Sequence, residues 1–121
     1  MKWETLSELG RELPSVVEGL WYRTPALGVR KRFFVRLKED GESVVFRLES
    51  LEEQEFLLES HGATYYITEH YRGYAAVLAH LKALSVPECR DRLERAWRAV
   101  APTALVKEFD RQAKPLRHRP R

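Results

Sequence analysis

The 121-residue sequence contains one cysteine, and its six glycines are scattered singly. A lone cysteine excludes an internal disulfide, and isolated glycines form neither a GxGxxG nor a GxxxxGK phosphate-binding loop. The four histidines make no HExxH motif and no i,i+4 pair, so we expect no metal site and no other cofactor. No apolar run approaches the roughly 18 residues that span a membrane. Nucleotide-dependent catalysis and a membrane anchor are therefore not expected, and a cytoplasmic protein is the default prediction.

The positive charge of the chain lies mostly at one end. The net charge is +3, but residues 111–121 carry five cations and no acid, so residues 1–110 have a net charge of −2. Residues 111–121 also contain two prolines and no periodic apolar residues. We therefore predict a single domain over 1–110 and a basic, disordered tail over 111–121. Such a tail would bind phosphate backbones non-specifically or would only keep the protein in solution.

Local patterns predict one α+β domain. Ser/Thr-x-x-Glu helix-start signals begin at Thr5, Ser50 and Ser85, and an Asp-Gly turn joins two neighbouring strands. Apolar spacing predicts helices over 4–12, 51–60, 87–100 and 103–112. Aromatic and β-branched residues between turn signals predict strands over 16–22, 26–30, 32–38, 43–49, 64–67 and 74–84.

Alternation within the strands predicts a sheet with one apolar face and one mixed face. In the strand 32–38, for example, Phe33 and Val35 alternate with Phe34 and Arg36. If the helices cover the apolar side, the open side carries Phe34, Arg36, Lys38, Arg47, His80 and Lys82. An open face with aromatic and cationic side chains suits a phosphate backbone. The alternative is an ordinary solvated antiparallel sheet.

Residues 68–74, TEHYRGY, bring a carboxylate, an imidazole, two phenols and a guanidinium together. A general base needs a partner that tunes its pKa and a pocket that excludes water. The sequence shows neither, so we interpret this segment as a turn between strands, with Gly73 at a positive φ and Arg72 in solvent. Cys89 is interpreted as a helix-face thiol without a role. We assign no catalytic residue.

Several segments have the order and spacing of a known family. After a helix ending in Leu13-Pro14 come WYRTPALGVRKRFFVRL (21–37), YITEHYRGYAAVL (66–78) and AWRAVAPTALVKEFD (96–110). The sequence resembles the MmcQ/YjbR family of small bacterial α+β proteins, which are often described as DNA-binding. The resemblance implies a single compact α+β domain with helices packed on one side of an antiparallel sheet, similar to the double wing domain of a phage transcription factor. It implies no catalytic residue.

Two hypotheses for function follow. The leading one is a non-enzymatic protein that binds DNA weakly, mainly through phosphates. Its candidate residues are Arg30, Lys31, Arg32, Phe34, Arg36, Lys38, Arg47, Arg72, Arg117, Arg119 and Arg121. The alternative is a protein- or small-ligand-binding module with an aromatic-lined groove, for which the candidates are Trp21, Tyr22, Tyr66, Tyr71 and Tyr74. The choice depends on which surface of the sheet is uncovered.

Overall fold

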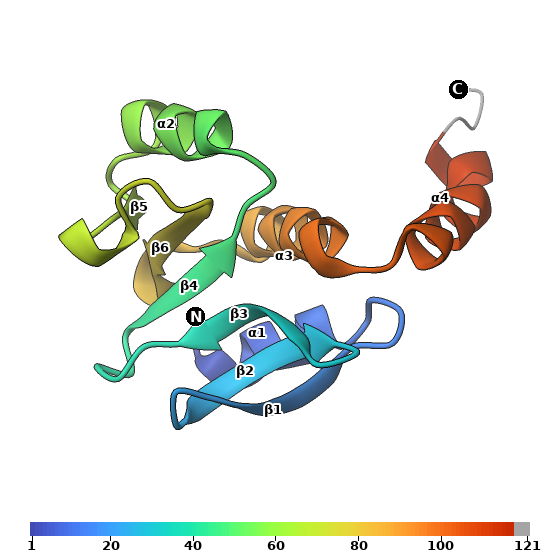
Figure 1. Cartoon of the computed structure of the whole chain (residues 1–121), viewed down its shortest axis with the longest axis horizontal. Coiled ribbons are helices and arrows are strands. Elements are labelled where there is room, and N and C mark those ends of the chain that lie inside the picture. Colours follow the sequence, from blue (N-terminus) through green and yellow to red (C-terminus); the bar gives the residue numbers. More distant parts are fainter. Residues whose placement is uncertain (118–121) are drawn as a thin grey trace.

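The computed structural model describes residues 1–117, with side chains described for residues 1–112. Six strands form one antiparallel sheet in the order β1-β2-β3-β4-β6-β5 (Figure 1). The strands are β1 (Val17–Trp21), β2 (Thr24–Val29), β3 (Arg32–Leu37), β4 (Ser43–Arg47), β5 (Tyr65–Tyr66) and β6 (Ala76–His80). The helices are α1 (Trp3–Gly10), α2 (Leu51–Ser60), α3 (Val86–Val100) and α4 (Thr103–Arg117), with 3-10 helices η1 (Glu69–Tyr71) and η2 (Leu81–Ala83). The predicted α+β fold class is confirmed.

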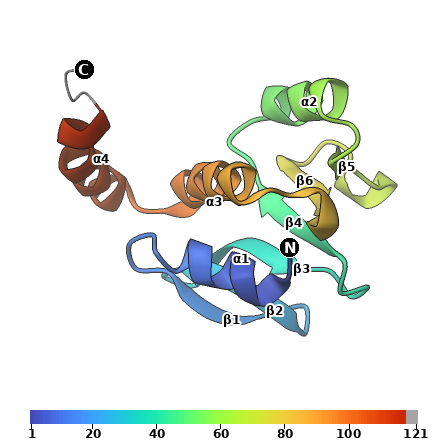
Figure 2. The same cartoon turned by 180° about the vertical axis from the view of Figure 1, so that it is seen from behind.

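Helices α1 and α3 cover one face of the sheet, as seen from behind in Figure 2. Between them and the strands lies the main hydrophobic core, in which Leu6, Val35, Phe46 and Trp97 are fully buried. Each large apolar side chain of this kind contributes about 1.5–3 kcal/mol when it leaves water. The helical face of the sheet is therefore closed, and a site on the sheet has to use the opposite face.

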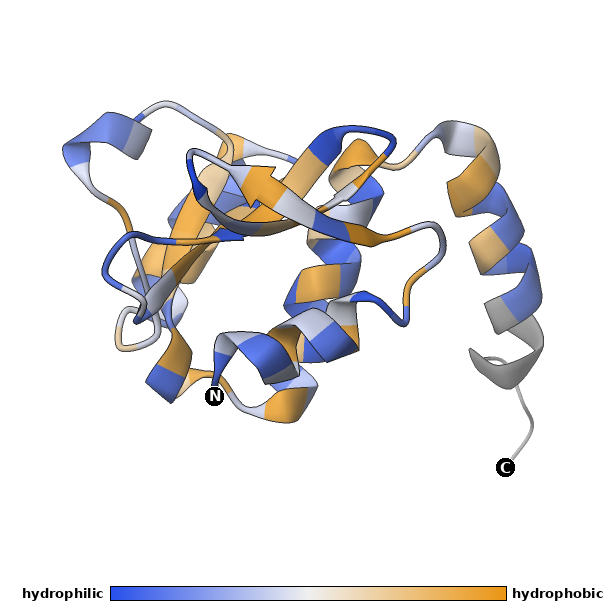
Figure 3. Cartoon of the chain, turned by 90° about the horizontal axis from the view of Figure 1, so that it is seen from below, coloured by the Kyte–Doolittle hydropathy of each residue, from blue (hydrophilic) through white to orange (hydrophobic). Residues whose placement is uncertain are grey.

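Helices α2 and α4 lie at the periphery of the sheet. Helix α2 is held to α3 by an ion pair of 2.7 Å between Glu53 and Arg92, both largely buried. Helix α4 projects to one side in Figures 1 and 3. It is anchored by the edge-on contact of Phe109 with Trp97, whose ring centroids are 5.0 Å apart.

Two of the three predicted helix starts are confirmed. The Oγ atoms of Ser50 and Ser85 each accept a hydrogen bond of 3.2 Å from the backbone N–H three residues later, as a capping box requires. The prediction for Thr5 is wrong, because α1 already begins at Trp3 and Lys2 supplies no side-chain cap. The earlier start allows Trp3 and Leu6 to be buried together on the sheet.

The last strand is shorter than its apolar pattern predicts. Strand β6 ends at His80 and not at residue 84, and the 3-10 helix η2 follows. The reason is the neighbouring strand: β4 begins at Ser43, which already pairs with His80. One more hydrogen bond follows, from the Leu81 N–H to the carbonyl oxygen of Glu42 at 2.9 Å. The residues before Glu42 form the turn between β3 and β4 and cannot extend the ladder.

A β-bulge in β3 changes which side chains face the helices. Leu27 pairs with Val35 but Gly28 pairs with Phe33, so Phe34 has no partner in β2. A bulge of this kind reverses the alternation beyond it. Phe34, predicted on the open face, is 1% exposed and belongs to the main core. Phe33, predicted in the core, instead stacks on Trp21 with ring centroids 5.7 Å apart.

Helix α4 is longer than predicted. It continues to Arg117, so the boundary predicted at residue 110 falls inside a helix, and the disorder predicted for the tail stays a prediction. Within the helix, Glu108 accepts a hydrogen bond of 2.8 Å from Gln112 and pairs with Arg111. Such i,i+3 and i,i+4 pairs support a helix that has few apolar contacts. Residues 118–121, which include Arg119 and Arg121, lie outside the described residues, as does the side chain of Arg117.

Candidate functional site

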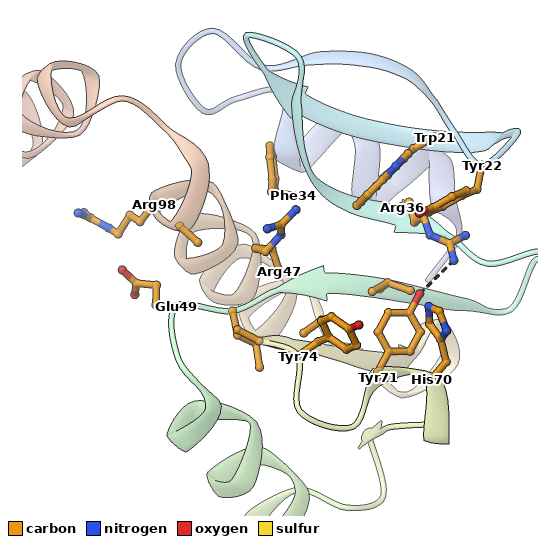
Figure 4. A pocket seen from close by; sticks show the side chains of 15 residues that line it. Trp21, Tyr22, Phe34, Arg36, Arg47, Glu49, His70, Tyr71, Tyr74 and Arg98 are labelled. Atoms are coloured by element: carbon orange, nitrogen blue, oxygen red, sulfur yellow. Dashed lines mark hydrogen bonds between the residues drawn. The ribbon is translucent and has the colours of Figure 1, made fainter.

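A groove of about 640 Å³ lies mainly on the face of the sheet opposite α1, and the C-terminal end of α3 reaches one side of it (Figure 4). This volume falls in the roughly 300–1,000 Å³ range of small-molecule sites. We call it the aromatic groove. It is lined by Trp21, Tyr22, Phe34, Arg36, Val45, Arg47, Leu48, Glu49, His70, Tyr71, Tyr74, Ala75, Ala76, Arg98 and Ala99. Four of the five aromatic residues predicted for a ligand groove are among them.

One wall of the groove comes from the tight turn between β1 and β2. Trp21 pairs with Thr24, which leaves Tyr22 and Arg23 as a two-residue loop with φ values of 53° and 66°. Positive φ at both positions is the pattern of a type I′ turn, which normally carries Asn-Gly or Asp-Gly. The rings of Trp21 and Tyr22 stack with centroids 5.4 Å apart. The tyrosine ring therefore stands at the rim of the groove.

The opposite wall is the segment TEHYRGY. It is the predicted turn between β5 and β6, with η1 inside it and Gly73 at φ 85°. The buried side chain of Gln54, from α2, fixes this segment through Nε2. It donates hydrogen bonds of 2.8 Å to the carbonyl oxygens of Tyr74 and Ala76, and one of 3.4 Å to that of Tyr71. Gln54 was missed in the sequence because nothing in the pattern of α2 distinguishes it from a solvated glutamine.

The sequence predicted Arg36 on an open face of the sheet, and this prediction is wrong. Arg36 is only 5% exposed, because the segment TEHYRGY covers it. Its Nη2 donates to the Tyr71 hydroxyl oxygen at 3.1 Å and its Nη1 to the carbonyl oxygen of Leu37 at 3.3 Å. Its guanidinium also lies 5.2 Å from the centre of the Tyr22 ring. Arg36 therefore holds the two walls together, and most of its hydrogen-bonding capacity is used within the protein.

The remaining two arginines of the groove differ in their surroundings. Arg98, from α3, pairs with Glu94 at 3.0 Å and with Asp110 at 2.5 Å, and these carboxylates raise the pKa of its guanidinium. Arg47, from β4, is half-buried and makes no hydrogen bond or ion pair with any side chain described in residues 1–112. Arg98 was missed in the sequence because the end of α3 meets the groove only in the folded chain. Glu49, which follows β4, was not predicted as a site residue either.

The other predicted residues lie away from the groove. The Tyr66 hydroxyl donates to Ser43 Oγ at 2.7 Å, and its ring stacks on His80. Lys38 is partly buried, 3.8 Å from Glu39, and Arg72 pairs with Glu69 at 2.8 Å in solvent. None of these three predicted residues, Tyr66, Lys38 or Arg72, lines the aromatic groove.

The predicted basic turn forms the tip of the β2–β3 hairpin. Arg30 and Lys31 have φ values of 50° and 72° and are exposed. Arg32 donates from Nη1 to the carbonyl oxygen of Val100 at the end of α3, at 3.2 Å. The three cations are thus brought together, but none of them lines the aromatic groove.

The histidine beside the groove and the single cysteine lie in different surroundings. His70 is exposed and makes ring contacts with Tyr71 and Tyr74, and it has no hydrogen bond to any described side chain. Within residues 1–112 no group of three or more His, Cys, Asp or Glu side chains is placed to hold a metal ion. Cys89 is fully buried, and burial raises the pKa of its thiol to about 12. No helix in the described part of the chain is long and apolar enough to cross a bilayer.

The fold and the groove define a small α+β domain with helices on one face of an antiparallel sheet and an aromatic groove on the other. The family model described as YjbR matches residues 11–99, and the chain belongs to this family. The resemblance predicted from the sequence is confirmed. The matched residues include all six strands and both walls of the groove. No curated protein matched the sequence.

Proposed function

We propose that this protein is a non-enzymatic binding module that uses the aromatic groove to hold a small ligand or a short protein segment. The observation that supports this most is the groove itself: exposed phenol rings and an unpaired arginine stand around one cavity. Concave sites with aromatic walls and a few polar groups are the usual form of ligand pockets. A cytoplasmic location stays a prediction from the sequence.

A thermal-shift screen with metabolites and short peptides tests this proposal, because a ligand that binds only the folded state raises the melting temperature. Each hit is then located by the NMR signal of the Trp21 indole N–H. Trp21 is the informative reporter, since Trp3 and Trp97 are buried in the core.

Binding is expected to weaken about tenfold or more in Tyr74→Ala. Phe56→Ala, which removes an exposed ring of α2 outside the groove, serves as the control. The proposal fails if no metabolite or peptide moves the Trp21 signal.

Weak DNA binding is a second candidate function, supported by the exposed cations at the tip of the β2–β3 hairpin. Arg30 and Lys31 form no ion pair with any described residue, so both are available to phosphates. The double wing likeness stays a prediction. The buried position of Arg36 and Phe34 removes the open sheet face on which the duplex was expected to lie.

Anisotropy of a labelled duplex at two salt concentrations tests this candidate. The full chain, the chain ending at Gln112, and Arg30→Ala/Lys31→Ala in the full chain are compared. Binding through the hairpin predicts loss in the double variant and retention in the shortened chain. Binding only by chains that keep residues 113–121 would reduce the activity to an effect of the C-terminal end, and absence of binding at low salt would exclude it.

A further inference from the structure

The three arginines of the aromatic groove are not equally available to a ligand. Arg36 is occupied by Tyr71, Leu37 and a contact of 3.6 Å with Glu39. Arg98 is neutralised by the two carboxylates described above. Arg47 alone among the three has no partner within residues 1–112. The groove therefore offers one uncompensated cation.

The position of Arg47 makes this cation significant. It projects from β4 between Phe34 and Tyr74, on the floor of the groove (Figure 4). A half-buried cation has lost part of its hydration, and an anionic partner restores the lost interaction. Glu49 also lines the groove, but it makes no ion pair with Arg47. Its negative charge works against a polyanion such as a nucleic-acid strand, and favours a ligand with a single anionic group.

Two exposed tyrosine rings define the rest of the ligand. Tyr22 is 67% exposed and Tyr74 is 64% exposed, although both line the groove. Tyr22 also keeps a left-handed backbone with a φ of 53°, which is strained for a residue with a Cβ atom. Strain held at a site is a reason to look for function there. Rings presented in this way stack on flat aromatic groups.

We propose that the aromatic groove binds a small planar aromatic ligand that carries one anionic group, a carboxylate or a phosphate. The ring lies against Tyr22 and Tyr74, and the anion pairs with Arg47. This inference rests on the proposed function of the groove and adds the chemical class of its ligand.

Matched pairs of probes test the ligand class. Indoleacetate is compared with indoleacetamide, and adenosine monophosphate with adenosine, so that each pair differs in its anionic group. Titrations follow the Trp21 indole N–H signal by NMR in the full-length protein. At least one anionic probe is expected to bind about tenfold or more tightly than its neutral partner, because hydrogen bonds to charged groups are the stronger ones. The two pairs distinguish a carboxylate ligand from a phosphate ligand.

The variant Arg47→Gln is expected to abolish the preference for the anionic probe while neutral probes bind as before. Arg95→Gln, which removes an exposed arginine on another surface of α3, is expected to leave the preference intact. The dispersion of the amide NMR spectrum checks that both variants are folded. Equal binding within each pair would overturn the ligand class but leave the proposed function standing. If none of the four probes moves the Trp21 signal, the ligand class is wrong, and the wider screen described above decides the proposed function separately.

Discussion

Arg36 donates a hydrogen bond from Nη2 to the hydroxyl oxygen of Tyr71 at 3.1 Å, and this bond joins β3 to the segment before β6. It closes one end of the aromatic groove and buries a guanidinium on the face of the sheet that was predicted to be open. Around it, Val45, Ala76 and Leu78 form a small second core against which Tyr71 packs. The groove is therefore a structured site with its own packing.

The Arg36–Tyr71 bond is expected to contribute measurably to stability. Tyr71→Phe leaves a buried charged donor without one of its acceptors, so the free energy of unfolding should fall by about 1–3 kcal/mol. Urea unfolding measures the change. Tyr74→Phe removes a hydroxyl that makes no hydrogen bond to a described residue, and it should stay within about 0.5 kcal/mol of the wild type. Equal effects of the two variants would contradict this assignment.

Gln54 is expected to control the order of the second wall. Gln54→Ala removes the side-chain donor to the buried carbonyl oxygen of Ala76 and one of two donors to that of Tyr74, which also accepts from the Ala76 N–H. This loss should cost about 1–3 kcal/mol. Amide hydrogen exchange should accelerate over residues 71–76 more than in β3. Unchanged exchange in residues 71–76 would show that the segment is held by other contacts.

Gln54→Glu extends the same test to pH. At neutral pH it places a carboxylate against carbonyl oxygens, so the pKa of the new carboxyl should be raised in the folded state. The loss of unfolding free energy caused by Gln54→Glu should therefore grow as the pH rises above the ordinary glutamate pKa of about 4.3, and it should shrink on acidification. Denaturant unfolding at several pH values measures this, with the exposed Glu55→Gln as the control. A penalty independent of pH would contradict the contact.

The two tight hairpin turns provide a matched comparison of strain and function. Arg30→Asn/Lys31→Gly supplies the residues that a type I′ turn prefers, and it should raise the free energy of unfolding by about 1 kcal/mol. Tyr22→Asn/Arg23→Gly relieves the same strain but loses the contacts of the Tyr22 ring with Trp21 and Arg36. Its gain should be smaller. Thermal unfolding measures both double variants.

Ligand binding separates these variants further. Only the Tyr22→Asn/Arg23→Gly variant should weaken binding in the aromatic groove. Weakened groove binding in the Arg30→Asn/Lys31→Gly variant would show that the effect comes from the sheet as a whole.

The raised pKa values of Cys89 and Tyr65 predict a loss of stability at alkaline pH. Burial raises the pKa of Cys89 from 9.0 to about 12, and burial followed by the hydrogen bond to Glu88 raises that of Tyr65. Because both pKa values are higher in the folded state, the unfolded chain loses its protons first. The contribution of these two groups to the free energy of unfolding is full below about pH 9, and it is lost as the pH rises from about 9 towards 12.

Melting temperatures across this range measure the loss. Cys89→Ala should make the decline less steep, whatever its effect at neutral pH. The native thiol should also react with a disulfide reagent only as fast as the protein opens. Rapid reaction of the folded protein would contradict the burial of Cys89.

Some features of the groove follow from local sequence. Ser50 and Ser85 begin helices because the hydroxyl of each accepts a hydrogen bond from the backbone N–H three residues later, which is a contact within the segment itself. TEHYRGY forms a turn because Gly73 accepts a positive φ. The aromatic residues Trp21, Tyr22, Tyr71 and Tyr74 were predicted from the sequence as candidates for a groove, together with Tyr66, which lies elsewhere.

What only the tertiary structure decided is the geometry that makes these residues a site. The bulge at Phe34 depends on the register of β3 against β2, which no pattern within β3 reveals, and it turned one predicted surface residue into core. The burial of Arg36 depends on the segment before β6 crossing the sheet. The sequence by itself determined the elements, since these follow from local backbone and side-chain preferences. Which cation was left unpaired depended on contacts between residues far apart in the chain, and these form only when the sheet is assembled.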